Sequence, residues 1–384
     1  MWFVRGIPLV GLFAVLVMLS PHGQGEPAKP SEGRPRDPMD LAIDGGLKFL
    51  AGSQNPDGSW SAIGLVQLPE IQPGRRPVPG TRTERPQGDV AVTSLAVMAF
   101  LSAGHVPGEG PYADRVSTGI RYVMNAQRAN GIFNAPLGGE MYYLGVCTLM
   151  LAEAIGMTDG ALAEEARKRL SAAVAAILAG QRKQGKDAGG WRYLQVGVDA
   201  DLSVTGWQLM ALRAAKNVGC DVPADRIAAA VEYVRRCHEA RTGGYMYTTA
   251  GPVTVPCTGV GILALELCGK EYHDSDEARK AGSYLLKTPI AVNTQHFFYA
   301  TYYTSQALFQ LGGDYWKAYR PILHKLLLET NPPATDGAWS SRGGWDDNRF
   351  GLAYCTAMAV LSLTVEYRFL PIYQRFEEPL ETNE

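Results

Sequence analysis

The sequence contains few of the signatures that identify a chemistry. It has no Cys-x-x-Cys pair, no zinc-ligand spacing, no glycine-rich nucleotide-binding motif ahead of a strand and no Gly-x-Ser-x-Gly motif. The formal net charge is −2, and the lysines and arginines form no basic stripe. These absences exclude nucleic acid as the main partner, and we predict neither a metal nor a cofactor.

Long apolar runs are also scarce, and the clearest one lies at the N-terminus. Arg5 precedes the apolar run Ile7–Leu19, and a small-x-small pattern follows at residues 23–25. The run is shorter than the roughly 20 residues of a membrane-spanning helix. We therefore predict a signal peptide at 1–25 and a flexible, Pro- and Gly-rich leader at 26–39. The protein would then be exported, to the periplasm or beyond, with no transmembrane segment in its mature part. An uncleaved N-terminal anchor is the alternative.

The chain has six cysteines, an even number that permits disulfides in an exported protein. Most of them lie inside apolar helical runs, which is typical of buried free thiols. Free thiols are therefore the expectation. The six are Cys147, Cys220, Cys237, Cys257, Cys268 and Cys355.

A threonine recurs along the chain, followed six residues later by a small or polar residue and then an apolar one. Its spacing of roughly 43 to 57 residues is that of one helix pair with its loops. The six positions are Thr93, Thr148, Thr205, Thr258, Thr301 and Thr356.

Two kinds of helical segment alternate along these repeats. Arg115–Gln127 and Glu164–Gln181 are amphipathic, whereas Val92–Ala103, Cys257–Cys268 and Tyr354–Val365 are apolar nearly all round. A helix of the second kind must be covered on every side. The alternation predicts an all-α fold with an inner apolar ring and an outer amphipathic ring of about six helix pairs. An open solenoid is the alternative fold.

The expected domain is a single α/α toroid over residues 40–376, followed by a short tail at 377–384. Leu68–Gln87, with several Pro and Arg, is interpreted as a surface loop in the first repeat. The oligomeric state is left open.

Residues 46–60 read Gly-x-x-Phe-Leu-x3-Gln-x3-Gly-x-Trp, and residues 119–133 repeat the pattern with Phe133 at its end. Weaker copies end at Trp191, Tyr245 and Trp339. This pattern resembles the Gln-Trp repeat of squalene and oxidosqualene cyclases, within the wider prenyltransferase and terpenoid-cyclase family. The resemblance covers nearly all of the mature chain and implies an α/α toroid. In physical terms, the Gln can bond backbone groups of the next loop, the Gly permits a tight turn and the ring can pack on a neighbouring repeat. The motif thus bears on the fold and not on chemistry.

The resemblance implies a proton-donating acid in an Asp-x-Asp-Asp-Thr run before an inner helix. The nearest run here spans residues 199–205, where only Asp201 aligns, and Ser203 and Val204 replace the other two acids. Asp199 and Asp201 remain candidates as a close carboxylate pair, one with a raised pKa. The competing interpretation is that Asp201, like Asp89, caps an inner helix.

Protein prenyltransferases of similar fold bind zinc through Asp-x-Cys and a His in a Phe-Tyr-His-Thr run. Here Ala300 occupies the His position, and Val255 stands where the Asp before Cys257 would be. We therefore predict that this zinc site is absent. Asp346-Asp347 are interpreted as part of a polar loop, because adjacent carboxylates point in different directions.

Aromatic residues gather at or near the starts of the predicted inner helices. If they face the lumen of the ring, they form a pocket suited to a hydrophobic small molecule or lipid, such as an isoprenoid. Plain core packing explains them equally well. The candidate ligand-binding residues are Trp207, Tyr142, Tyr143, His296, Tyr299, Tyr302 and Tyr354.

Three functions stay open. In the first, the toroid binds a hydrophobic ligand in its lumen without reacting it. In the second, it is a terpenoid cyclase-like enzyme that uses Asp199 and Asp201. In the third, it is a structural or interaction protein whose lumen is filled by its own side chains.

Overall fold

The computed structural model describes residues 37–62, 89–135, 138–268 and 270–374. The predicted signal peptide, most of the predicted leader, the predicted loop Leu68–Gln87 and the tail at 377–384 lie outside these described residues. The first helix begins at Pro38, two residues ahead of the expected start of the toroid.

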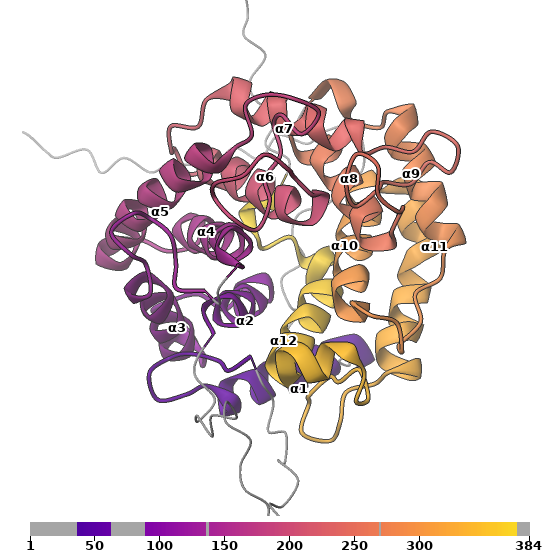
Figure 1. The fold of residues 1–384 in the computed structure, drawn as a ribbon. Coiled ribbons are helices and arrows are strands. Elements are labelled where there is room, and N and C mark those ends of the chain that lie inside the picture. The colour runs from indigo at the N-terminus through magenta and orange to yellow at the C-terminus, as the bar shows by residue number, and fades with distance from the viewer. Residues whose placement is uncertain (1–36, 63–88, 136–137, 269, 375–384) are drawn as a thin grey trace, which may run out of the picture.

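Within the described residues the chain forms twelve α-helices that alternate between two concentric layers (Figure 1). The outer helices are α1 (Pro38–Ser53), α3 (Ala113–Asn125), α5 (Gly160–Gly180), α7 (Ala224–Arg236), α9 (Asp276–Lys287) and α11 (Gly313–His324). The inner helices are α2 (Val90–Ser102), α4 (Glu140–Gly156), α6 (Leu202–Asn217), α8 (Val255–Cys268), α10 (Phe297–Leu311) and α12 (Trp345–Leu363). Short 3-10 turns η1 (Lys270–Tyr272), η3 (Thr364–Tyr367) and η4 (Pro371–Tyr373) and a π-helical turn η2 (Lys325–Thr330) complete the described elements.

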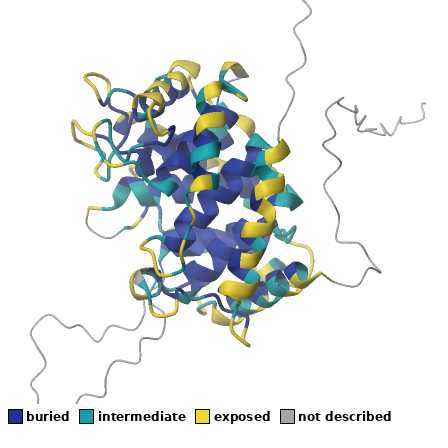
Figure 2. Cartoon of the chain, turned by 90° about the vertical axis from the view of Figure 1, so that its right-hand side faces the viewer, coloured by how far each residue is buried: buried dark blue, intermediate teal, exposed yellow. Residues whose placement is uncertain are grey.

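The inner helices pack in chain order, and α12 packs against α2, which closes the ring. Every residue of α2 is buried, whereas the amphipathic α3 buries one face only, through residues such as Val116, Ile120 and Val123. Figure 2 shows the same layering, with the buried colour inside and the exposed colour on the outer helices. The predicted all-α toroid is therefore confirmed, and its closed form is preferred over the open solenoid.

The repeated threonines join each motif loop to its inner helix. In four repeats the threonine hydroxyl accepts a hydrogen bond from the backbone N–H of the aromatic residue that ends the motif. Both partners are buried, so the loop is held by a satisfied polar contact inside the core. The donor and acceptor pairs are Trp60 and Thr93 at 2.9 Å, and Trp191 and Thr205, Tyr245 and Thr258, and Trp339 and Thr356, each at 3.0 Å.

The motif glutamines connect neighbouring repeats. In three repeats the side-chain amide donates both to a carbonyl of its own loop and to a carbonyl of the next outer helix. The sequence predicted a bond to the next loop, and the structure shows that the partner in the next repeat is a helix. The helix carbonyls belong to Arg115 for Gln54, Arg169 for Gln127 and Arg226 for Gln181, each at 2.9 Å.

The motif glycines are required by close approach as well as by conformation. Gly189 has φ of +89°, and a Cβ atom there would lie 1.9 Å from the carbonyl oxygen of Ala229 on α7. Gly337 has φ of +90°, and its Cβ would lie 2.1 Å from the carbonyl oxygen of Gly45 on α1. The last motif loop therefore packs on the first outer helix, which closes the outer ring too.

The C-terminal turns lie across the end of the ring at which the inner helices finish. Ile372 of η4 donates its N–H to Glu153 of α4 at 3.2 Å, and the hydroxyls of Tyr373 and Tyr302 lie 2.6 Å apart. Glu153 is 1% exposed, and burial raises its pKa to about 8. By length and composition the stretch Asp346–Tyr367 would suffice to span a membrane, but 78% of its apolar window is buried inside the ring, as in the core helix of a folded domain.

Candidate functional site

The candidate residues from the sequence gather at the end of the ring where the inner helices begin. Tyr142 and Tyr143 lie in the first turn of α4, and both are half-buried. His296 precedes α10 and has a left-handed backbone, with φ of 62°. We call this end of the ring the mouth, since the opposite end is covered by the C-terminal turns.

Asp201 caps α6. Its Oδ1 accepts from the backbone N–H of Val204 at 2.9 Å and from the hydroxyl of Ser203 at 2.7 Å. Burial raises the pKa of Asp201, and the hydrogen bonds and the charge of Arg192 offset this only in part. The predicted cap is therefore present, and it engages one of the two carboxylate oxygens.

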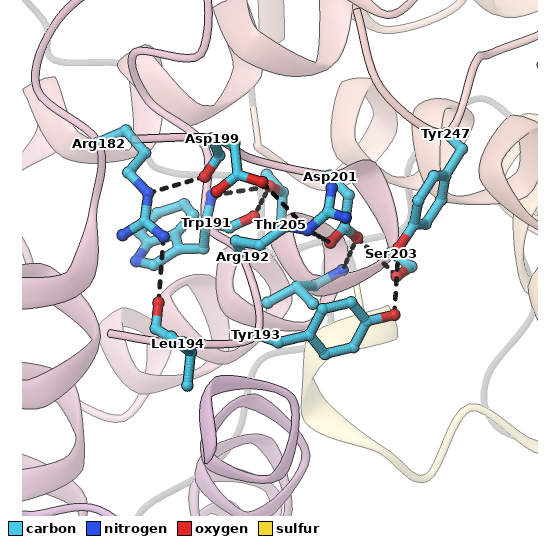
Figure 3. Close-up of polar contacts among 11 residues, drawn as sticks. Arg182, Trp191, Arg192, Tyr193, Leu194, Asp199, Asp201, Ser203, Thr205 and Tyr247 are labelled. Carbon is cyan, nitrogen blue, oxygen red and sulfur yellow. Dashed lines mark hydrogen bonds and ion pairs between the residues drawn. The ribbon is translucent and has the colours of Figure 1, made fainter. Parts of the chain in front are cut away.

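Asp199 and Asp201, the predicted carboxylate pair, both lie beside the same arginine. The Nε of Arg192 lies 3.6 Å from Asp199 and 3.5 Å from Asp201, so a cation stands beside both acids (Figure 3). Asp199 has 59% of its side chain exposed, whereas that of Asp201 is fully buried. For Asp201 the cation offsets only part of the effect of burial, which raises the pKa of this carboxyl.

Asp89 repeats this arrangement at the start of α2. Its Oδ1 accepts from the N–H groups of Ala91 and Val92, each at 2.9 Å, and its Oδ2 accepts from the hydroxyl of Tyr143. The predicted cap at Asp89 is confirmed. The hydroxyl of Tyr143 therefore points towards the capping carboxylate of Asp89, and Tyr143 is not part of the aromatic cluster around Trp207.

Trp207 of α6 is the centre of an aromatic cluster. Its indole stacks on the ring of Tyr302 with centroids 6.0 Å apart, and it meets Tyr142 at 6.1 Å and Tyr303 at 5.6 Å edge to face. Trp207, Tyr302 and Tyr303 are 2% exposed or less, so they fill the ring between α6 and α10. Offset and edge-to-face pairs of this kind each contribute about 0.5–1.5 kcal/mol beyond burial.

The cluster continues towards the mouth. Tyr299 lies 4.7 Å from Tyr303 and 6.2 Å from His296 between ring centroids. On the other side, Tyr142 stacks on Tyr193 at 6.5 Å. Tyr354 of α12 packs on Phe350. The structure therefore joins Trp207, Tyr142, His296, Tyr299 and Tyr302 of the sequence-based set to Tyr193 and Tyr303, which are not in that set.

Several polar atoms of this cluster are buried without a hydrogen-bond partner among the described residues. They are Nε1 of Trp207 and the hydroxyls of Tyr299 and Tyr303. Buried polar groups in native proteins are nearly always satisfied, by protein, water or a ligand. The cluster thus contains donors that interact with one another at most weakly, within an otherwise apolar surrounding.

Two hollows among the described residues lie away from the aromatic cluster. One of about 410 Å³ opens on the outer surface beside α9 and is lined by residues such as Arg241, Lys280 and Tyr315. Another of about 10 Å³, room for one water molecule, lies at the covered end beside Gln306 and Tyr373. On the mouth side of the cluster, Tyr142 is half-buried.

The interpretation of Asp346-Asp347 as a polar loop is wrong, because both residues lie in the first turn of α12. Asp346 is fully buried, and its Oδ2 accepts from the backbone N–H of Phe298 at the start of α10, at 3.0 Å. Its Oδ1 has no partner among the described residues. Burial, together with the neighbouring charge of Asp347, raises the pKa of Asp346 to about 6, against the effect of the backbone donors.

The pKa of Asp347 is shifted in the opposite direction to that of Asp346. Burial acts against its ionisation, but the hydroxyl of Ser340, the N–H groups of Ser341 and Gly343 and the thiol of Cys355 all donate to it. These donors lower its pKa. Two adjacent carboxyl groups with pKa values displaced in opposite directions form a pattern typical of acid and base roles.

A backbone feature explains why the sequence did not reveal Asp346. In α2 and α6 the capping aspartate stands four residues before the repeat threonine, whereas Asp346 stands ten before Thr356. Gly351, with φ of 81°, interrupts α12 and turns its first residues away from the main axis. The side chain of Asp346 thus caps α10, a neighbouring helix.

The six cysteines are all free thiols, as the sequence favoured. Burial raises the pKa of most of them, which keeps them protonated and unreactive. Among the described residues no group of three or more His, Cys, Asp or Glu side chains is arranged to hold a metal ion.

No protein-family model matches the sequence, and no curated protein matches it either. Solved structures do match. An inactive variant of the α-1,6-mannanase GH76A of Salegentibacter sp. HEL1_6 has a TM-score of 0.63 at 10% identity and covers 87% of this chain and 100% of its own. The type II terpene cyclase MstE from Scytonema has a TM-score of 0.54 at 17% identity, covering 85% and 98%. A D-mannose isomerase has a TM-score of 0.59 at 13% identity, covering 85% and 96%.

These similarities establish the fold. The chain is an α/α toroid, a fold that it has in common with a terpene cyclase, a glycosidase and a sugar isomerase. Three chemistries on one fold mean that the function must be argued from the site.

Proposed function

We propose that this protein is a binding protein for an apolar, isoprenoid-like ligand, which it holds against the aromatic cluster at the mouth. The observation that carries the proposal is the set of unpartnered buried polar atoms on Trp207, Tyr299 and Tyr303 within that cluster. A ligand with an apolar chain and one oxygen atom would contact the rings and accept from these donors.

Two further points support this assignment. The related terpene cyclase from Scytonema, at 18% identity, binds geranylgeranyl dihydroxybenzoate, a long isoprenoid chain that ends in a polar ring. In the present chain one carboxylate oxygen of Asp201 is engaged in capping a helix, which argues against its use as a proton donor. Binding requires the cluster alone, whereas cyclisation through Asp199 and Asp201 requires an acid that is free to reach the ligand.

The test is ligand extraction followed by titration. The purified protein is extracted with organic solvent and examined by mass spectrometry, and geranylgeraniol is then titrated into the extracted protein. Trp207→Phe should weaken binding by up to about tenfold, because it removes a donor and part of the stacking surface. Trp316→Phe, on the outer helix α11, is the matched control and should bind as the parent does. Equal affinity in the two variants would refute the proposal.

Asp346 favours a second candidate function, acid catalysis on the bound ligand. Its carboxyl is buried, and its Oδ1 has no hydrogen-bond partner among the described residues. Because its pKa is about 6, the carboxyl is protonated below about pH 6. It also lies close to Tyr354, whose pKa is raised by burial first, then by the charges of Tyr142 and Asp346. A protonated carboxylic acid beside aromatic faces is able to protonate an alkene and stabilise the resulting cation.

The second candidate predicts cyclised product from geranylgeraniol in the wild type, with a rate that falls as the pH rises above about 6. Asp346→Asn should abolish the product while geranylgeraniol still binds. Binding without any product in the wild type, at pH 5 as well as pH 7, would leave the binding function and eliminate catalysis.

A further inference from the structure

The loop between α5 and α6 carries apolar side chains that are unusually exposed. Val196 is 87% exposed, Val198 is 88% exposed and Leu194 is 51% exposed. Elsewhere in the described part of the chain, only Leu41 and Ile322 are large hydrophobic residues with comparable exposure. Three such side chains within five residues form an apolar tip, which we define as Leu194, Val196 and Val198.

The tip is held in place from behind by one buried side chain. The guanidinium of Arg182, 7% exposed, donates to the carbonyls of Asp199 at 2.8 Å and Leu194 at 3.0 Å (Figure 3). It also donates to the carbonyl of Gln195 at 2.9 Å. The side chain of Gln195 donates in turn to the carbonyl of Ala176 on α5. The loop backbone is therefore fixed, and the valines are exposed in an ordered conformation.

The connection that carries the tip also carries exposed basic residues. Lys183 and Lys186 are exposed on the same connection, directly after Arg182. Arg236 of α7 is exposed as well and donates to the carbonyl of Lys186 at 3.1 Å, which places a third cation there. The exposed acid of the loop, Asp199, is paired with Arg192 at 3.6 Å. The exposed charge on this connection is therefore mainly positive.

The geometry points to an anionic lipid bilayer as the surface that this tip meets. A stable protein interface buries about 800 Å² on each partner, more than three small side chains on a protruding loop provide. A bilayer needs no complementary shape. Apolar side chains enter the boundary between headgroups and acyl chains to a depth of about 5–10 Å, and nearby lysines and arginines are attracted to anionic headgroups.

The tip also adjoins the mouth. Tyr193, the residue before Leu194, stacks on Tyr142, and Tyr142 meets Trp207. Docking through the tip would hold the mouth at the bilayer surface, the place where apolar molecules reside. Docking itself needs neither a ligand nor a reaction, so it stands apart from the binding function proposed above.

The test uses the full chain and a fluorescent probe placed at the tip itself. A local probe is needed because the apolar N-terminal run could attach the chain to vesicles without any contact from the tip. A tryptophan is introduced as Val198→Trp, and the added fluorescence is followed with vesicles of phosphatidylcholine and phosphatidylglycerol that carry brominated acyl chains. Val198→Trp should show a blue shift and bromine quenching on these vesicles, and both should decrease in high salt. Ile322→Trp, on the outer surface of α11, is the matched control and should show neither.

A second pair of variants measures the contribution of the tip. Val196→Ser with Val198→Ser should weaken partitioning by about tenfold per valine, since burying one valine is worth at least that factor. Leu41→Ser, on α1, should leave partitioning unchanged. Equal bromine quenching of the tryptophans at positions 198 and 322 would overturn the inference. So would the absence of quenching at position 198 while the chain sediments with the vesicles. A blue shift of the tryptophan at position 198 that occurs only when another protein is added would also overturn it.

Discussion

The buried Glu153 gives the toroid a stability that depends on pH. In the unfolded chain its pKa is the ordinary 4.5, and in the folded protein burial raises it to about 8. Between these values the folded state retains a proton that the unfolded state has released, so stability falls as the pH rises. From pH 6.5 to pH 8 the loss from this one group is about 1.5 kcal/mol, obtained by integrating the two titrations.

Glu153→Gln should remove this dependence. The glutamine keeps an oxygen to accept from Ile372, and it has no charge to bury. In the same pH range Asp346 titrates lower, and burial moves the pKa of His105 down and that of the Cys355 thiol up. Urea denaturation at pH 6.5 and pH 8 measures the difference, and Glu165→Gln on α5, a half-exposed position, is the control.

The expected result is a decrease of about 1.5 kcal/mol in the unfolding free energy of the wild type and of the control, and little change in Glu153→Gln. If the three proteins show the same pH dependence, Glu153 is not the buried acid that the structure describes. The link between Glu153 and the C-terminal turn η4 would then be lost as well.

Three further substitutions test how the ring is fastened, each by urea denaturation. Gly189→Ala should cost at least about 3 kcal/mol, since its Cβ would collide with α7, whereas Gly185→Ala in the same loop has open space and should cost only about 1 kcal/mol of backbone strain. Gln127→Met should cost about 1–2 kcal/mol, because two carbonyls lose their donor. Asp201→Ala should cost about 1–2 kcal/mol through loss of the α6 cap, and equal stability would disprove the cap.

The ring could be predicted from sequence because its determinants are local and repeated. An apolar helix such as α2 has to be covered on all sides, and the alternation with amphipathic helices such as α3 leaves few arrangements. The periodic threonines and glutamines marked the joints between repeats. The exact partner of each glutamine, a carbonyl on the next outer helix, depends on the relative placement of two repeats, which no local pattern encodes.

The site could be predicted only in part, for the same reason. The aromatic residues were recognisable by their positions at inner-helix starts, but whether they enclose a space or fill it depends on packing across the ring. Asp346 was missed because it caps α10 from α12, across a kink at Gly351. The cation beside Asp199 and Asp201 comes from Arg192, at the end of a motif loop, and it alters the interpretation of both acids.

The unpartnered hydroxyls in the cluster distinguish a packing role from a binding role. The hydroxyls of Tyr299 and Tyr303 lie close enough to interact, but neither makes a hydrogen bond of normal geometry to another described residue. A buried polar group that stays unsatisfied costs about 1–3 kcal/mol. If the cluster served packing alone, phenylalanine would be the more stable choice. Tyr303→Phe should therefore raise the free energy of unfolding by about 1 kcal/mol and weaken geranylgeraniol binding. A loss of stability in Tyr303→Phe would mean that the hydroxyl is already satisfied, by water or by Tyr299, and that the polar atoms of the cluster are no evidence for a ligand.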